Sequence, residues 1–195
     1  MFRIALQSMV GRWSDVAGAV FAALTLGLLA PITLDFRADL PITLQSLLVL
    51  WLPLMFGWRA GLAGVLGYLV MGAMGLPVFA GGASGVAPLM GPTGGYLLAF
   101  PMAGALVGLW GEQIEARSLR LPYLHTAAAM VAGHGLILAG GMFWQFKIAP
   151  PPATPFQILE SLAPAIAVKC SLGVLLTVIL SRAYSRAQGP TDSSL

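Results

Sequence analysis

The sequence predicts an all-α integral membrane protein with six transmembrane helices and with both termini in the cytoplasm. Of its 195 residues, 58% are hydrophobic and only 9% are charged, whereas soluble domains carry about 25% charged residues. Because a membrane-spanning helix needs about 20 apolar residues, a chain of this length accommodates six spans with short connections. We therefore expect residues 1–195 to form a single transmembrane domain in the lipid bilayer.

Apolar runs separated by charged residues or by Pro/Gly clusters define the expected helices in chain order. They lie at about 15–34, 43–57, 59–75, 93–110, 122–145 and 162–182. Only a turn around Gly57 separates the second span from the third, so these two spans should form a helical hairpin. The segment before the first span lacks a small-residue cleavage site behind a short apolar core, so we expect that span to remain in the protein.

The lysines and arginines indicate how the spans are oriented. With the N-terminus inside, the cytoplasmic side holds Arg3, Arg12, Arg59, Arg117, Arg120, Arg182 and Arg186. The other side holds Arg37 and Lys147, and Lys169 lies within the last span. The positive-inside rule then places both termini in the cytoplasm. These residues form no cluster of the kind that binds nucleic acid.

The segment 76–95 is apolar and uncharged but cannot form a continuous helix. It contains six glycines and three prolines, which disfavour helix strongly. Irregular backbone near a membrane must be satisfied by protein or water rather than by lipid. We therefore expect residues 76–92 to form an outer capping loop folded inward over the bundle. Its backbone could line a pocket for a small polar ligand, or it could be a compact plug or an ordinary long connection.

Lys169 is the one ionisable side chain deep inside an apolar span. Such a lysine is disfavoured by about 2.5–3.5 kcal/mol on insertion scales, so it needs a partner, water or a ligand. If the last helix begins near Pro164, Lys169 lies about 8 Å below its outer end. A ligand-binding role is the leading interpretation, and snorkelling to the interface is the alternative.

Two further polar residues are candidate ligand contacts on the outer side. Gln45, at the start of the second span, could donate to and accept from a ligand, or could bond a neighbouring helix. Arg37, in the first outer loop, could close over an anionic group, or could simply be solvated.

Several residues that suggest enzymes or cofactors lack the pattern that those functions need. His125 and His134 have no second metal ligand at helical spacing, and Ser84 does not lie in a nucleophile turn. The Gly-rich segment lacks the Gly-Lys-Ser/Thr ending of a phosphate loop, and the single Cys170 excludes an internal disulfide. We expect no catalytic residue, no metal, no cofactor and no ATP site in this chain.

Small residues recur four apart on the first span. Gly18 and Ala22, and likewise Ala19 and Ala23, allow another helix to approach closely. This spacing suggests a docking surface for a partner protein, although alanine-rich membrane helices contain it by chance.

Three motifs taken together resemble the BioY family of biotin-capturing S components in energy-coupling factor transporters. They are Pro41-Ile42-Thr43-Leu44-Gln45, the block from Gly75 to Gly82, and the block from Gly91 to Leu98. The resemblance implies an S-component fold in the inner (plasma) membrane of a prokaryote. It also implies biotin uptake from outside, with a transmembrane coupling protein and ABC-type ATPases as partners that alone use ATP. It places partner docking at Ala19 and Ala23, and it leaves homo-oligomerisation open.

The last helix departs from the family pattern, which reads approximately Pro-Gly-Asp-x-x-Lys. This chain matches the proline and the lysine at Pro164 and Lys169, but Ile166 replaces the acid. In the family, both the acid and the lysine are implicated in holding biotin, so one polar contact is in doubt.

The resemblance allows candidate ligand contacts to be assigned by chemistry. The side chains expected to hold the apolar parts of biotin are Phe79, Trp51 and Tyr96. The side chains expected to hold its polar groups are Gln45, Ser84, Thr93, Lys169 and Arg37. Alternative hypotheses are a related ligand such as dethiobiotin, an intramembrane enzyme that uses Ser84 or His134, and a purely structural subunit.

Overall fold

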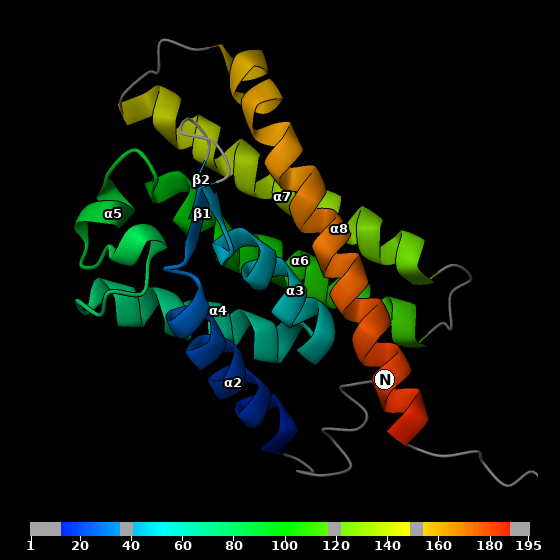
Figure 1. Ribbon diagram of the computed structural model, residues 1–195. Helices are drawn as coiled ribbons and strands as arrows, with labels where there is room; N and C mark the ends of the chain where they lie inside the picture. The colour runs from blue at the N-terminus through cyan, green and yellow to red at the C-terminus, as the bar shows by residue number, and fades with distance from the viewer. Residues whose placement is uncertain (1–12, 36–40, 117–121, 149–153, 188–195) are drawn as a thin grey trace, which may run out of the picture.

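The protein is a bundle of helices that carries a two-stranded ribbon at one end. The computed structural model describes residues 13–35, 41–116, 122–148 and 154–187. The elements in chain order are α2 (Ser14–Leu29), β1 (Thr33–Asp35), β2 (Pro41–Thr43), α3 (Gln45–Phe56), α4 (Trp58–Ala73), a 3-10 turn (Ala80–Gly82), α5 (Ala87–Met90), α6 (Gly94–Ala116), α7 (Pro122–Ile148) and α8 (Pro155–Ala187) (Figure 1).

The helical class that the sequence predicts is confirmed. By length and composition, α6, α7 and α8 are long and apolar enough to cross a membrane, with 23, 27 and 33 residues. The helices α2 and α3 are apolar but shorter. The hairpin expected around Gly57 is present, because α3 ends at Phe56 and α4 begins at Trp58.

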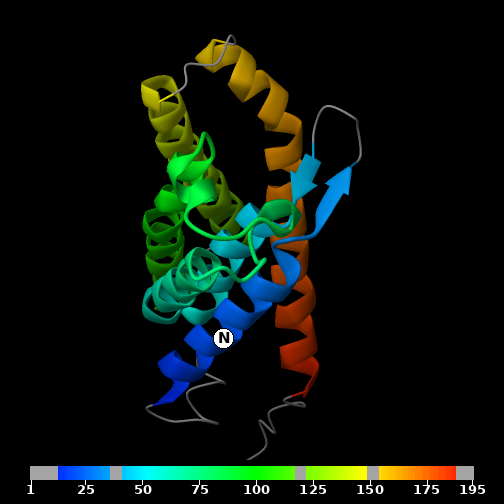
Figure 2. The same cartoon turned by 90° about the vertical axis from the view of Figure 1, so that its left-hand side faces the viewer.

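The first predicted span, 15–34, is too long. The helix α2 ends at Leu29, and Pro31, which follows two residues later, has no N–H with which to continue the helical hydrogen bonds. The chain then forms β1, which pairs antiparallel with β2 in the register Thr33 to Thr43. The sequence analysis did not predict this ribbon, which lies beside α8 in Figure 2.

The last helix begins earlier than the sequence predicts. Thr154 Oγ1 accepts a hydrogen bond from the Gln157 backbone N–H, and Gln157 Oε1 accepts one from the Thr154 N–H at 2.8 Å. This reciprocal cap starts α8 at Pro155, and Pro164 lies inside the helix rather than at its start. Lys169 is therefore about 21 Å along the helix instead of about 8 Å.

The small residues of α2 pack against α4 of the same chain. Gly18 and Ala22 are buried, and a Cβ added at Gly18 would lie 3.1 Å from Ala60 Cβ. A Cβ added at Gly64 would lie 2.6 Å from Ala22 Cβ. The prediction that Gly18 and Ala22 form a partner-docking surface is therefore wrong, since a helix of the same chain covers them. Ala19 and Ala23 are only partly buried.

This contact predicts a loss of stability when Gly64 is enlarged. Gly64→Leu should lower the free energy of unfolding by about 1–3 kcal/mol, because overpacking forces α2 away from α4. Thermal unfolding in detergent measures the change. Ala63→Leu, which adds the same side chain at an exposed position of α4, is the matched control, and equal melting temperatures for the two variants would contradict the prediction.

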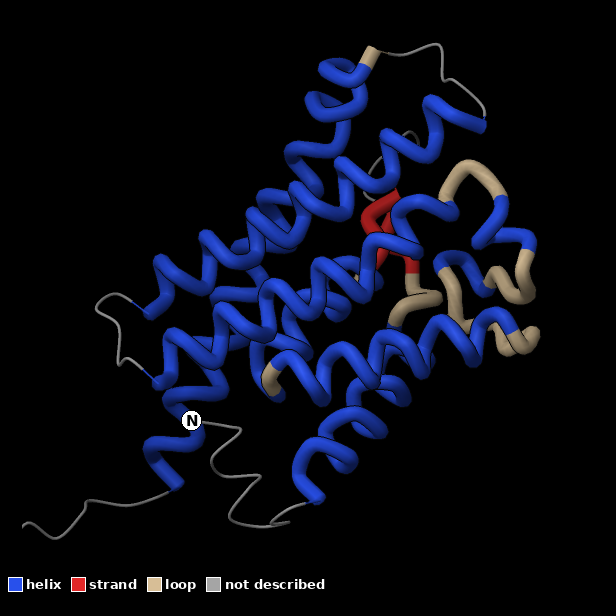
Figure 3. Tube along the Cα trace, turned by 180° about the vertical axis from the view of Figure 1, so that it is seen from behind, coloured by secondary structure: helices blue, strands red, loops and turns tan. Residues whose placement is uncertain are grey.

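The strands and most of the described loop residues gather at one end of the bundle, here called the loop end (Figure 3). The loop end contains β1, β2 and residues 76–93, together with the N-terminal ends of α3, α6 and α8 and the C-terminal end of α7. The opposite end contains the C-terminal ends of α3, α6 and α8 and the N-terminal end of α7.

Candidate ligand-binding site at the loop end

A cavity of about 780 Å³ opens at the loop end, here called the loop cavity. Its volume is within the range of about 300–1,000 Å³ that is usual for small-ligand sites. Its walls come from β2, α3, the segment 76–93, α6, α7 and α8. Segments between Thr43 and Lys169 thus come together at one site.

Lys169 lines the loop cavity from α8. Its Nζ donates a hydrogen bond to Ser46 Oγ at 2.8 Å, across to the first turn of α3. Among the described residues, no carboxylate forms an ion pair with it. Ile166 also lines the cavity, one helical turn before Lys169. The position where the family has an acid therefore faces the same space as the lysine.

Gln45 is buried and lines the cavity beside Ser46. Its Nε2 donates to the Tyr68 hydroxyl of α4 at 2.6 Å. That bond fixes the side chain and leaves the amide oxygen as the group that can accept a hydrogen bond from a ligand.

His134 on α7 also lines the loop cavity, and it is only 3% exposed. Its Nδ1 lies 2.9 Å from the Met130 carbonyl oxygen. Because a carbonyl can only accept, Nδ1 carries the proton and Nε2 of the neutral ring is an acceptor. Nε2 is buried and has no hydrogen-bond partner in the described part of the chain. Buried polar atoms are normally paired, so this nitrogen is available to a ligand donor.

The segment 76–93 contributes several residues to the cavity lining, among them Phe79 and Thr93. Phe79 is buried, with its ring edge-on to Tyr68 at a centroid distance of 5.6 Å. The Gly85 N–H donates to the Gly72 carbonyl at 2.7 Å, which ties the segment to the end of α4. Gly81 and Gly82 have φ of 67° and 76°, where a residue with a Cβ is strained. The tight turn places Phe79 on the cavity wall.

The wall opposite α8 is aromatic and is held to α7. Tyr96 lines the cavity, and its hydroxyl donates to Gln145 Oε1 at 3.1 Å. Thr93 also lines it, with its hydroxyl donating to the Pro88 carbonyl at 3.2 Å. The Trp144 indole donates to the Gly91 carbonyl at 2.9 Å, which joins the segment to α7.

The structure brings together five of the eight residues that the sequence assigns to the ligand. Lys169, Gln45, Phe79, Thr93 and Tyr96 line the loop cavity, and their contact with a ligand stays a prediction.

The other three residues do not join them. Trp51 is absent from the cavity lining, and its Nε1 donates to Thr177 Oγ1 at 3.1 Å, toward the opposite end of the bundle. Ser84 is exposed and also absent from the lining. Arg37 lies outside the described residues.

The sequence analysis did not assign five polar lining residues to the ligand: Thr43, Ser46, His134, Gln145 and Ser161. The adjacency of Ser46 to Gln45 was a usable signal, whereas Gln145 is recognisable only through its bond to Tyr96. The sequence analysis considered His134 as a metal ligand or a catalytic residue and did not predict an unpaired Nε2 facing a ligand. Across the described ranges, no group of three or more His, Cys, Asp or Glu residues gathers to hold a metal ion.

Comparison with known proteins places this architecture in a family. The chain is 38% identical over 157 residues to a biotin transporter of Lactococcus lactis subsp. cremoris, covering 80% of this chain and 82% of that protein. It is 40% identical over 181 residues to a biotin transporter of Rhodobacter capsulatus, covering 86% and 88%.

A solved structure shares the fold. The crystal structure of an S-component for biotin from an ECF-type ABC transporter superposes with a TM-score of 0.70 and 22% sequence identity, over 86% of this chain and 90% of that one. The family model for the BioY family matches residues 7–188. A model match over nearly the whole length, together with relatives that align over most of theirs, establishes that the chain belongs to the BioY family.

Proposed function

We propose that this protein is the biotin-binding S component of an ECF-type vitamin transporter and takes up biotin from the outside. The loop cavity carries this proposal, because it combines one lysine, amide and imidazole groups and an aromatic wall in a member of the BioY family. Relatives named biotin transporters and the fold shared with a biotin S-component support it.

The chemistry of the cavity matches the three parts of biotin. The ureido ring donates and accepts hydrogen bonds, which suits the Gln45 amide oxygen and His134 Nε2. The apolar bicyclic ring and tail suit Phe79 and Tyr96. The carboxylate is an anion that Lys169 can hold, and none of the described lining residues is an acid that would compete for the lysine. No covalent chemistry is part of this function.

The membrane arrangement that we propose has six spans and both termini in the cytoplasm, in the plasma membrane of a prokaryote. Three long apolar helices and the shorter apolar helices α2 and α3 support it. The distribution of arginines supports a loop end on the outside in this proposal. The whole chain forms one transmembrane domain, and residues 76–92 form its outer cap over the ligand.

The energy for uptake comes from partners in this proposal. The partners are a transmembrane coupling protein and ABC-type ATPases, and the ATPases use the ATP. The solved neighbour is the S-component of an ECF-type ABC transporter, which supports such an assembly. On α2, Ala19 and Ala23 remain the proposed docking residues because they are only partly buried. Formation of a homo-oligomer is an alternative assembly.

Purification without added biotin tests the function directly. Native mass spectrometry should detect a bound molecule of biotin's mass, and titration with biotin should give saturable binding at one site. Dethiobiotin is the competitor that tests the related-ligand alternative, because it lacks the thioether ring. Absence of both a co-purified ligand and measurable binding would contradict the proposal.

His134 offers a sharper test of the site. His134→Phe keeps a ring of similar size but removes Nε2, so biotin affinity should fall about tenfold, the loss of roughly one hydrogen bond. His125→Phe, on the same helix but outside the cavity, is the control and should bind biotin normally. Isothermal titration in detergent measures both, and an unchanged dissociation constant for His134→Phe would exclude a ligand contact at Nε2.

A further inference from the structure

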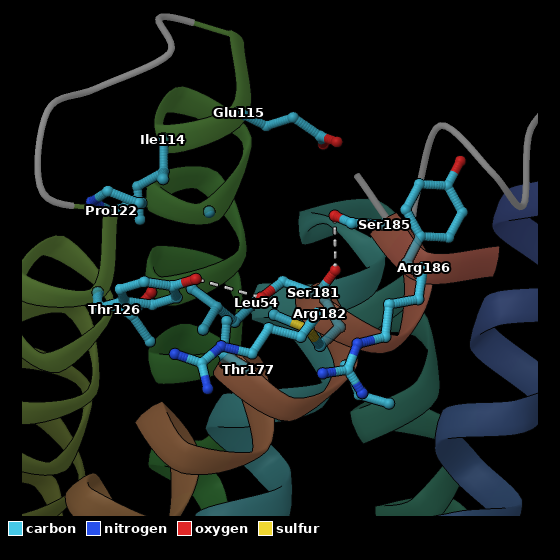
Figure 4. A pocket seen from close by; sticks show the side chains of 15 residues that line it. Leu54, Ile114, Glu115, Pro122, Thr126, Thr177, Ser181, Arg182, Ser185 and Arg186 are labelled. Carbon is cyan, nitrogen blue, oxygen red and sulfur yellow. Dashed lines mark hydrogen bonds between the residues drawn. The ribbon is translucent and has the colours of Figure 1, made fainter. Parts of the chain in front are cut away.

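A second cavity, of about 640 Å³, lies at the opposite end of the bundle (Figure 4), here called the arginine cavity. Its walls are the C-terminal ends of α3, α6 and α8 and the N-terminal end of α7. The Tyr123 hydroxyl and Ser181 Oγ, 3.3 Å apart, link α7 to α8 across it. Ser181 Oγ already donates to the Val178 carbonyl, so the tyrosine is the donor in this link.

Two arginines of α8 line this cavity. Arg182 and Arg186 are four residues apart, so they lie on one face of the helix, where like charges repel each other. Neither guanidinium has a hydrogen bond or an ion pair within the described part of the chain. Figure 4 shows both groups along one edge of the cavity, with the carboxylate of Glu115 at the other edge. An anion near the two arginines would relieve their repulsion.

Part of the remaining lining is apolar, between polar side chains that include Thr126, Thr177 and Ser185. Leu54, Met55, Ile114 and Leu180 line the interior. Leu124 and Ile179, which follow and precede the lining residues Tyr123 and Leu180 in the sequence, are 63% and 52% exposed. Exposed apolar side chains of this kind on membrane helices face acyl chains, so a lipid can enter the cavity from the side.

We infer that the arginine cavity binds an anionic phospholipid, with the phosphate of the headgroup at Arg182 and Arg186 and an acyl chain along the apolar walls. Basic pockets between membrane helices recognise such headgroups. An acidic segment of a partner protein would satisfy the arginines but not the apolar interior, and for this reason the lipid is the better match. The inference does not depend on biotin binding at the loop end.

Native mass spectrometry of the full chain, titrated with short-chain phosphatidylglycerol or phosphatidylcholine, tests the inference. Wild-type protein should bind one phosphatidylglycerol about tenfold more tightly than phosphatidylcholine or better, as two arginines near a headgroup imply. The double variant Arg182→Gln/Arg186→Gln should lose this preference. Arg182→Lys/Arg186→Lys should keep most of it, and Arg59→Gln should keep all of it, because Arg59 lies over the Trp58 ring outside the cavity.

Control titrations separate the possible ligands. Inorganic phosphate at millimolar concentration should not displace the phosphatidylglycerol, since it lacks the acyl chain, and displacement would point to a site for free anions. A different outcome would indicate a protein partner: the wild type binds a glutamate-rich peptide, and it binds phosphatidylglycerol and phosphatidylcholine with equal affinity. Either result, or an unchanged lipid preference in the double glutamine variant with a normal size-exclusion profile, would overturn the inference.

Discussion

Lys169→Met is expected to weaken equilibrium biotin binding by about tenfold or more. A hydrogen bond to a charged group contributes about 1.5–3 kcal/mol, and each 1.4 kcal/mol is tenfold in affinity. Methionine keeps the length and most of the volume of the lysine side chain, so the cavity wall at α8 stays filled. The variant also removes an amine whose burial is unfavourable, and we therefore expect the fold to be at least as stable as before.

Binding to purified protein in detergent measures this effect, and two controls sharpen it. Ser46→Ala removes the acceptor at 2.8 Å from Lys169 Nζ but keeps the cation, so it should weaken binding less than Lys169→Met. Trp51→Phe removes the bond to Thr177 outside the loop cavity and should leave biotin binding unchanged. Wild-type affinity in Lys169→Met would remove this lysine from the site.

The helices were predictable from the sequence because their signal is local. Apolar runs identified all of the long helices, and the turn at Gly57 identified the α3–α4 hairpin. The ribbon β1–β2 was missed because a three-residue strand is too short to show an alternating pattern. The first predicted span, 15–34, also included most of β1. The start of α8 was missed because Pro164 suits a first helical turn equally well, whereas the true cap at Thr154 lies in a more polar stretch.

The sequence predicted part of the candidate site, and it failed where contact depends on the direction of a side chain. Gln45 and Lys169 stood out as polar residues in apolar runs, whatever their orientation. Trp51 lies in such a run as well, but its indole turns toward Thr177 instead of the loop cavity. Gly18 and Ala22 form a stripe that suits any close helix, and no local pattern identifies that helix as α4.

The arrangement at Ile166 follows from the same reasoning. Its side chain lines the loop cavity with Lys169, so the family's acid would place a carboxylate near the ligand and near the lysine. With isoleucine there, the lysine bonds Ser46 instead, and the wall becomes more apolar. The acceptors that we propose for the ureido ring are then Gln45 on α3 and His134 on α7, which both line the cavity.

Gly72→Val is expected to disrupt the 76–93 segment and the loop cavity together. A Cβ added at Gly72 would overlap the Phe79 ring, and that ring is only 2% exposed, so it cannot swing aside without leaving its place against Tyr68. Overpacking of this kind costs about 1–3 kcal/mol in the free energy of unfolding. Because Phe79, Ala80 and Ala83 line the cavity, biotin affinity should fall with stability.

Gly135→Val separates this effect from the general cost of valine in a helix, because a Cβ added at Gly135 meets nothing within 4 Å. A double-mutant cycle then identifies the contact. If valine at position 72 acts by displacing the Phe79 ring, Phe79→Ala should destabilise the Gly72→Val protein much less than it destabilises the wild type, since the ring is already out of place. Thermal unfolding with and without biotin measures all four corners of the cycle. If the two losses of stability are strictly additive, the valine acts elsewhere on α4 and not through the Phe79 ring. The placement of the 76–92 segment against the cavity would then not depend on the contact between Gly72 and Phe79.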